Sequence, residues 1–303
     1  MARGYLPLLA IVAAIWGSSY MFIKVAVDEI EPTAMMFLRL VLALAVLLPV
    51  LFVAVGARRA VADMRGMGGG AFVVGLLNMA LPFVLIAWGE KHIDSGIAAI
   101  ANASVPIFVA LLALRFNPQE RVRGLRLAGV LVGFAGVGVL TGLHPEGGWW
   151  AIAGTLAVVL ASLSYAASNH YVQHRFTVTA PLLLTTASCA AGALILLPFA
   201  VLQAPEETPS WEALASVAVL GILGTAVALL FFYRMLSSYG ATRSSLVTYL
   251  LPPTALIYGT LILDEPITLN AILGLVLILA GVALGSGLLR FPRREPVPAT
   301  PRP

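Results

Sequence analysis

The charged residues of this chain lie in short gaps between long apolar runs, and the sign of the charge alternates from gap to gap. The gaps at 28–31 and 264–265 are acidic, whereas those at 58–65 and 115–126 are basic. A chain that crosses a bilayer repeatedly shows this pattern, because cytoplasmic loops collect Lys and Arg. Only 11% of the residues are charged, against roughly a quarter in soluble domains. We therefore expect an all-α integral membrane protein that has the lipid bilayer, not nucleic acid, as its partner.

A membrane-spanning helix needs about 20 residues to cross roughly 30 Å of hydrocarbon. The sequence predicts ten such helices, at residues 5–27, 33–55, 67–89, 95–114, 124–142, 149–173, 180–202, 212–236, 242–263 and 267–288. An even number of spans places both termini on one side. If that side is cytoplasmic, fifteen of the 18 Lys and Arg residues lie inside and eleven of the 14 acids lie outside. We thus expect cytoplasmic termini in the cell inner (plasma) membrane, with a Pro-rich, disordered cytoplasmic tail at 290–303.

Proline and glycine positions indicate an internal repeat. An offset of 145 or 146 residues carries Pro106 onto Pro252, Gly129 onto Gly274, and Ser19 onto Ser164. The sequence predicts a first five-span repeat at 1–142 and a second at 147–289. Because five is odd, the second copy enters the bilayer from the opposite side. Inverted repeats of this kind place a substrate site near the midplane, between the two copies.

The same residues resemble a known family. The resemblance rests on Ala14-Ile-Trp-Gly-Ser-Ser-Tyr20 in the first span, Phe37-Leu-Arg39 in the second, Ser104-Val-Pro106 in the fourth, and Asp264-Glu-Pro266 after the ninth. This pattern is similar to that of the ten-span EamA-type family of the drug/metabolite transporter superfamily, and more finely to that of YddG-type exporters of aromatic amino acids. The resemblance implies two inverted five-helix repeats around a central cavity, and export of small metabolites.

One face of the first span offers substrate-binding chemistry. Trp16, Tyr20 and Lys24 recur at four-residue spacing and so share a helix face, with Ser19 beside them. A cation attracts a carboxylate, and aromatic rings stack on an aromatic side chain. The alternative is that Lys24 snorkels to the interface and the rings pack in the core. Arg39 in the second span has two equal readings, structural pairing and substrate attraction.

Prolines preceded by polar side chains mark other cavity candidates. Proline frees a backbone carbonyl and bends the helix, which a membrane tolerates only where protein or a wet cavity satisfies the backbone. Pro106 and Pro252 are therefore hinge candidates, with a static kink as the alternative. The candidates for the cavity in these and neighbouring spans are Asn78, Phe83, Asn102, Phe232, Thr248 and Tyr249. Packing or interface anchoring is the alternative for the aromatic members.

The sixth span is unusually polar for a membrane helix. Ser164 and Ser168 share one stripe, and Tyr165 and Asn169 share another. A lipid-facing helix would not carry these side chains, so we expect them to face the interior. Interhelical hydrogen bonds are the alternative to substrate contact.

These features favour a transporter over an enzyme. The four histidines are not grouped with acids in any span, Cys189 is alone, and no acid is expected in a membrane core. No catalytic residue, metal or cofactor is therefore predicted. We expect alternating-access export of small metabolites, most of all amino acids including aromatic ones. Nucleosides, organic cations or drugs are the alternative substrates, and an integral membrane enzyme is the alternative class. We expect a monomer, with a homodimer as the alternative.

Overall fold

The computed structural model describes residues 4–116, 125–141 and 148–285, and every regular element in these ranges is helical. The helices are α1 (Tyr5–Val27), α2 (Pro32–Val55), α3 (Ala57–Gly66), α4 (Gly69–Val74), η1 (Gly75–Ala80), α5 (Leu81–Glu90), α6 (Ser95–Asn102), α7 (Val105–Phe116), α8 (Leu125–Thr141), α9 (Gly148–Arg175), α10 (Pro181–Leu202), α11 (Trp211–Gly221), η2 (Ile222–Val227), α12 (Ala228–Tyr239), α13 (Ala241–Ser244), α14 (Val247–Ile262) and α15 (Leu269–Gly285). The tail predicted at 290–303 lies outside the described residues.

Seven helical stretches are long and apolar enough to cross a bilayer. They are Tyr5–Val27, Pro32–Val55, Gly69–Glu90, Ser95–Leu112, Gly148–Arg175, Pro181–Leu202 and Trp211–Tyr239. Three apolar helices, Leu127–Leu140, Val247–Ile262 and Leu269–Leu284, are shorter. Each of the predicted spans overlaps one of these stretches, and the chain has the helices of a multi-pass membrane protein.

Local sequence sets several helix ends. Pro32 and Pro181 stand at the first position of α2 and α10, where the missing N–H costs no intrahelical bond. Ser210 caps α11, since its hydroxyl accepts a hydrogen bond from Ala213 N at 3.2 Å. Gly56 and Gly240 end α2 and α12 at φ of 84° and 80°, a region that glycine enters without steric cost.

Two long helices contain a π-helical turn in their middle. In Gly69–Glu90 the π turn is η1, and in Trp211–Tyr239 it is η2. A π turn accommodates one residue more than an α turn, and such turns are rare. The two begin at Gly75 and Ile222, so they occupy matching places in the third and eighth of the predicted spans.

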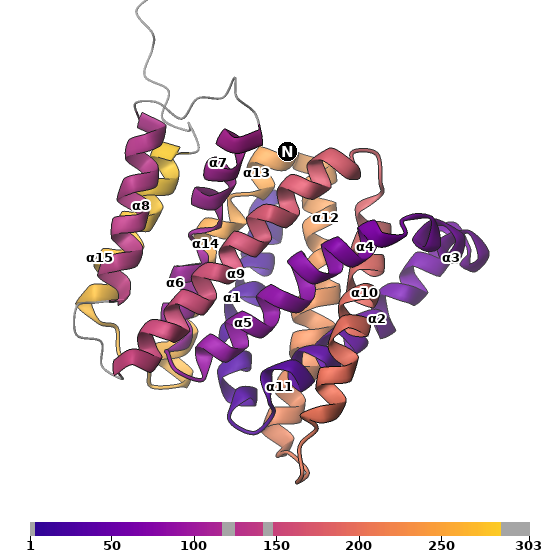
Figure 1. Cartoon of the computed structure of the whole chain (residues 1–303), viewed down its shortest axis with the longest axis horizontal. Helices are drawn as coiled ribbons and strands as arrows, with labels where there is room; N and C mark the ends of the chain where they lie inside the picture. Colours follow the sequence, from indigo (N-terminus) through magenta and orange to yellow (C-terminus); the bar gives the residue numbers. More distant parts are fainter. Residues whose placement is uncertain (1–3, 117–124, 142–147, 286–303) are drawn as a thin grey trace, which may run out of the picture.

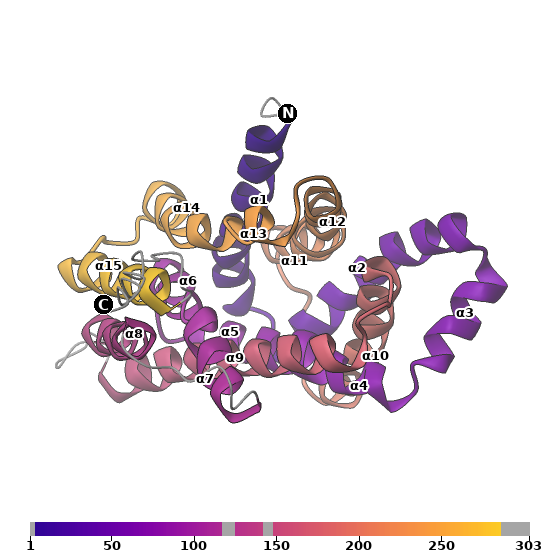
Figure 2. The ribbon, with the colours of Figure 1, turned by 90° about the horizontal axis from the view of Figure 1, so that it is seen from above.

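The helices pack in corresponding pairs between a first half (α1–α8) and a second half (α9–α15). Helix α5 packs on α9, as α11 and α12 pack on α1; α6 and α7 pack on α9, as α14 packs on α1. The two halves also meet through α2 on α10 and α8 on α15. Figure 1 shows α1 descending from the N-terminus near the top while α9 rises from the bottom. Seen from above, α8 and α15 lie together at one side and α2 and α10 at the other (Figure 2).

Small residues bring α8 and α15 together. A Cβ atom on Gly281 would lie 2.5 Å from the backbone N of Gly133 and 2.6 Å from the carbonyl of Gly129. A Cβ on Gly274 would lie 2.8 Å from that of Leu140. The glycines noted in the sequence therefore permit close contact between two helix backbones.

The two predicted hinge prolines stand in different local structure. Pro106 is the second residue of α7, after a break at Ala103 and Ser104 between α6 and α7. Pro252 is buried inside α14. The corresponding break of the second half comes earlier, between α13 and α14. Proline thus follows a helix break in one half and lies within a helix in the other.

Candidate functional site

A cavity of about 700 Å³ lies between the two halves. Its middle is formed by α1, α2, η1, α9 and η2. At one end it is lined by Ile23, Ile86 and Ala99, and toward the other by Phe176, Thr179 and Leu236. We call the first the acidic end, after Asp28, Glu31, Asp94 and Glu265, and the second the basic end, after Arg175, Arg234 and Arg243.

Most of the residues singled out in the sequence meet at this cavity. The predicted residues that line it are Trp16, Ser19, Tyr20, Asn78, Phe83, Asn102, Pro106, Tyr165, Ser168, Asn169, Phe232, Thr248 and Tyr249. They come from seven separate helical segments of both halves. Polar and aromatic side chains from several helices therefore meet at one cavity, which is the usual composition of a small-molecule site.

Hydrogen bonds fix several of these side chains. Asn102 donates to the hydroxyl of Tyr20 at 2.8 Å. The indole N–H of Trp16 donates to the carbonyl of Gly224, in η2, at 3.1 Å, and its ring centroid lies 5.3 Å from that of Phe232. The aromatic wall of the cavity thus spans both halves, and contacts with other protein groups hold Trp16 in place.

Arg39 supplies a cation to the cavity. Its side chain is buried, and its Nε donates to the hydroxyl of Thr225, in η2, at 2.9 Å. The guanidinium carbon lies 4.1 Å from the ring centroid of Phe83, a cation–π contact. No carboxylate lies within ion-pair distance of Arg39 among the residues that the structure describes. Arg39 therefore brings a buried positive charge to the cavity wall, with Thr225 and Phe83 as its neighbours.

Two predicted cavity residues lie elsewhere. The Nζ of Lys24 donates to the carbonyls of Glu90 at 2.7 Å and Ile93 at 3.0 Å. Carbonyls at a helix end lack intrahelical partners, so the ammonium group turns to the link between α5 and α6. The hydroxyl of Ser164 is buried and donates to the carbonyl of Leu77, in η1, at 2.8 Å. Ser164 thus joins two helices. Pro252 also does not line the cavity.

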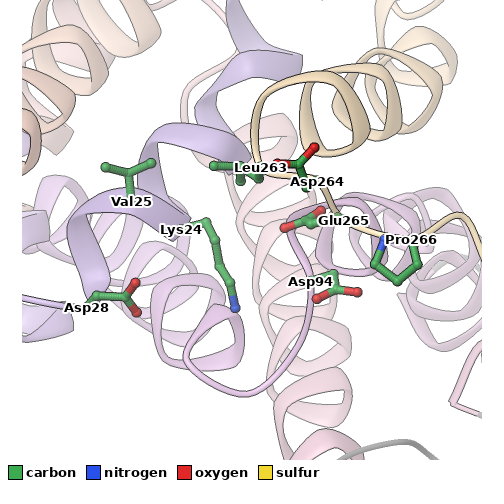
Figure 3. A pocket seen from close by; sticks show the side chains of 8 residues that line it. All are labelled: Lys24, Val25, Asp28, Asp94, Leu263, Asp264, Glu265 and Pro266. Carbon is green, nitrogen blue, oxygen red and sulfur yellow. The ribbon is translucent and has the colours of Figure 1, made fainter.

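A second pocket opens beside Lys24 at the acidic end. It is lined by Lys24, Val25, Asp28, Asp94, Leu263, Asp264, Glu265 and Pro266. Figure 3 shows Lys24 between Asp28 on one side and Asp94 and Glu265 on the other. Over the described ranges, no group of three or more His, Cys, Asp and Glu side chains is arranged to hold a metal ion.

Hydrogen bonds join the two halves at the acidic end. Glu265 accepts hydrogen bonds from Ser95 N at 2.8 Å, Ser95 Oγ at 2.7 Å and Gly96 N at 3.3 Å. A carboxylate at a helix N-terminus is favoured by the unpaired N–H groups there. Asp264 has a φ of 55°, in the left-handed region that Asp enters more readily than most residues. This turn precedes Glu265 in the link between α14 and α15.

A parallel contact joins the α1–α2 loop to the second half. Glu29 accepts hydrogen bonds from the backbone N and the hydroxyl of Ser210, both at 2.6 Å. These bonds hold the pKa of the exposed Glu29 carboxyl below its usual value. The contact is therefore complete at neutral pH and is lost only when acid protonates Glu29.

Glu90 is an acid buried inside the protein, which the sequence did not predict. The sequence places it in the loop after the third span, but it is the last residue of α5 and its side chain is 0% exposed. Both carboxyl oxygens are buried, and no residue in the described part of the chain is their hydrogen-bond partner. The sequence gives no sign of this burial, because Glu90 is followed by the hydrophilic residues Lys91 and His92. Helices α1 and α9 and the α14–α15 link cover it only in the folded chain.

Comparison with known proteins agrees with this architecture. The EamA-like transporter family matches the chain twice, at residues 4–142 and 152–287. An uncharacterized transporter of Archaeoglobus fulgidus is 27% identical over 90% of this chain and 95% of its own length. The uncharacterized inner membrane transporter YedA of Escherichia coli K12 is 26% identical over 97% of this chain and 96% of its own length.

Another relative has a more specific name. A probable terminal-alkyne amino-acid exporter of Streptantibioticus cattleyicolor is 30% identical, with 95% of each chain covered. A protein of known crystal structure, 19% identical, superposes with a TM-score of 0.64 over 95% of this chain and 98% of its own, and shares the fold. The two family matches together span nearly the whole chain. This protein belongs to the EamA-like transporter family, and it is a membrane transporter.

Proposed function

We propose that this transporter exports amino acids with apolar or aromatic side chains, by alternating access across an inner membrane. The observation that carries the proposal is Arg39, a buried cation at the cavity without a carboxylate partner among the described residues. A guanidinium group binds a carboxylate through paired N–H donors. Trp16, Phe232, Tyr165 and Tyr249 offer aromatic surface to an apolar side chain.

The substrate's ammonium group needs oxygen atoms that accept hydrogen bonds. The side chains of Asn78, Asn102 and Tyr20 line the cavity and carry such oxygens. A cation at one point and neutral acceptors at others suit a zwitterion better than an organic cation, because Arg39 repels a purely cationic ligand. The name of the Streptantibioticus relative, an amino-acid exporter, is consistent with this substrate class.

Alternating access requires two halves that move relative to each other. We infer ten spans in two inverted repeats with cytoplasmic termini. Supporting observations are the two family matches, the π turns at corresponding places, and the paired packing of equivalent helices. On this topology the basic end is cytoplasmic and the closed acidic end is external. The cavity reaches toward the cytoplasm, as expected of a carrier that is ready to receive its cargo. Since one chain supplies the whole cavity, a monomer suffices.

Transport by purified protein in proteoliposomes tests the proposal. We expect counterflow of labelled phenylalanine and leucine, and competition by an alkyne-bearing amino acid. A nucleoside and tetraethylammonium should neither be carried nor compete. Empty liposomes and protein-containing liposomes without counter-substrate are the controls. Transport of the organic cation alone would contradict the amino-acid proposal and leave the family assignment intact.

A further inference from the structure

We propose that Glu90 is the proton-binding site of this transporter, and that it exchanges one proton for the ammonium group of the substrate. The transporter would then be a proton/amino-acid antiporter. This inference rests on the proposed function, because it assigns the energy source of the same transport cycle. The Glu90 carboxyl lies close to the cavity but does not line it.

The environment of Glu90 favours a bound proton in this conformation. Its side chain is fully buried, and neither carboxyl oxygen has a hydrogen-bond partner among the described residues. An ionised carboxylate is strongly disfavoured in such a place unless it is paired and hydrogen-bonded. The Nζ of Lys24 is nearby but donates to the Glu90 carbonyl, not to its carboxyl. The neutral acid is the form that this packing accommodates.

Glu90 also lies between the two pockets. Ile86, one turn earlier on the same face of α5, lines the end of the central cavity together with Ile23. Lys24, whose Nζ lies 2.7 Å from the Glu90 carbonyl oxygen, lines the pocket at the acidic end together with Glu265. A group at this point can become accessible from the cavity in one conformation and from the external pocket in the other. Alternating access of a proton requires such a location.

The charges around Glu90 allow both protonation states over a cycle. Lys24 and Tyr20 on α1 and Arg39 on α2 are its electrostatic neighbours, with Glu265 from the α14–α15 link. Helix α9 contributes the uncharged Gly154 and Val158 next to Gly89. Two cations stabilise the carboxylate once it is exposed, and Glu265 opposes it. When the substrate's carboxylate neutralises Arg39, its ammonium group is the cation available to Glu90.

One proton is exchanged for one substrate molecule in each transport cycle. The empty carrier with its cavity toward the cytoplasm holds a proton on Glu90. Binding of the zwitterion places its ammonium group among the oxygens of Tyr20 and Asn102, and this positive charge favours the ionised form of the nearby Glu90. The O–H bond breaks, and the proton passes to cytoplasmic water. After reorientation the substrate leaves, and a proton from outside re-forms the O–H bond. One neutral substrate moves out for each proton that moves in, and no other bond changes.

Proteoliposomes with an imposed pH gradient test this exchange. With the acidic side opposite to the substrate, wild-type protein should concentrate phenylalanine or leucine on the acidic side by up to about tenfold for each pH unit, the limit for one proton per substrate. A pH-sensitive dye should report protons moving against the substrate. In Glu90→Gln, which keeps shape but cannot release a proton, any remaining flux should ignore the gradient. Glu207→Gln, at an exposed loop residue, should behave as wild type.

Infrared spectroscopy provides a readout that does not depend on transport. Wild-type protein at neutral pH should show the C=O band of a protonated carboxyl, which Glu90→Gln removes and added substrate diminishes. Gradient-driven accumulation that survives in a folded Glu90→Gln, protons that move with the substrate, or a carboxyl that is ionised at neutral pH would each overturn the inference. Counterflow that ignores the gradient in wild type would overturn it while leaving the proposed export function standing.

Discussion

The guanidinium group of Arg39 contacts a hydroxyl group through one nitrogen and an aromatic ring through its central carbon. Its Nε bonds to Thr225 at 2.9 Å, and its plane faces Phe83 at 4.1 Å. Arg39→Gln removes the charge that the substrate carboxylate would meet. Because a charged hydrogen bond is worth about 1.5–3 kcal/mol, we expect substrate affinity to fall by roughly 10- to 100-fold. Binding calorimetry with phenylalanine on purified protein measures this loss.

Arg39→Lys is the matched variant. Lysine keeps the charge but loses the planar stacking on Phe83 and the directed bond to Thr225. Its affinity should lie between those of wild type and Arg39→Gln, with thermal stability near that of wild type. Equal affinity in all three proteins would exclude Arg39 from the substrate site.

At the scale of elements, the contact of α8 with α15 depends on a missing side chain. A Cβ on Gly281 would meet three backbone atoms of Gly129 and Gly133 within 2.7 Å, so the two helices must separate. We expect Gly281→Ala to destabilise the protein by about 1–3 kcal/mol, as overpacking does. A Cβ atom on Gly138 of α8 would meet no atom of a neighbouring described segment within 4 Å. Gly138→Ala should therefore leave the melting temperature unchanged or raise it. Equal melting temperatures of the two variants would show that the α8–α15 contact can accommodate an added methyl group.

At the scale of the whole molecule, Glu265 contributes to the closure of the acidic end. Glu265→Ala removes three hydrogen bonds between the halves. At about 1 kcal/mol each, their loss should shift the population toward the conformation that opens at this end. A cysteine at Ile23→Cys, in a Cys189→Ser background, reports the shift through faster labelling by an impermeant maleimide from outside. Glu206→Ala, in an exposed loop, is the control, and unchanged labelling in Glu265→Ala would remove Glu265 from the gate.

The sequence predicted helices and shared faces better than the use of individual side chains. The apolar runs located the helical stretches because burial in lipid leaves a compositional trace, and helical spacing put Trp16 and Tyr20 at one cavity. Lys24 shares that face but reaches two carbonyls at the end of α5 and beyond. Those acceptors belong to residues far away in the sequence, so spacing on α1 alone carries no information about them.

Burial of single charges was equally invisible to sequence patterns. Glu90 looks like a loop acid because Lys91 and His92 follow it, and its burial arises only when α1, α9 and the α14–α15 link pack around it. The readings of Arg39 as structural or substrate-binding remained equal, since its partner Thr225 lies in the other half of the chain. Hydropathy also gave no sign of the π turns, because a π turn changes the direction in which the following side chains point but does not alter composition.

The extra residue in each π turn limits the changes of helix length that the transporter can tolerate. Each added residue rotates everything beyond it by about 100°, the angle between successive residues of a helix. Asn78 and Phe83, five residues apart across the end of η1, both line the cavity. Loss of one residue here, for example Leu77, would leave an ordinary helix long enough to span. The part of this helix after the deletion would be rotated, so that Phe83, Ile86 and Glu90 would face other neighbours. The chain would insert into the membrane normally, but these side chains would no longer take their places in and beside the cavity.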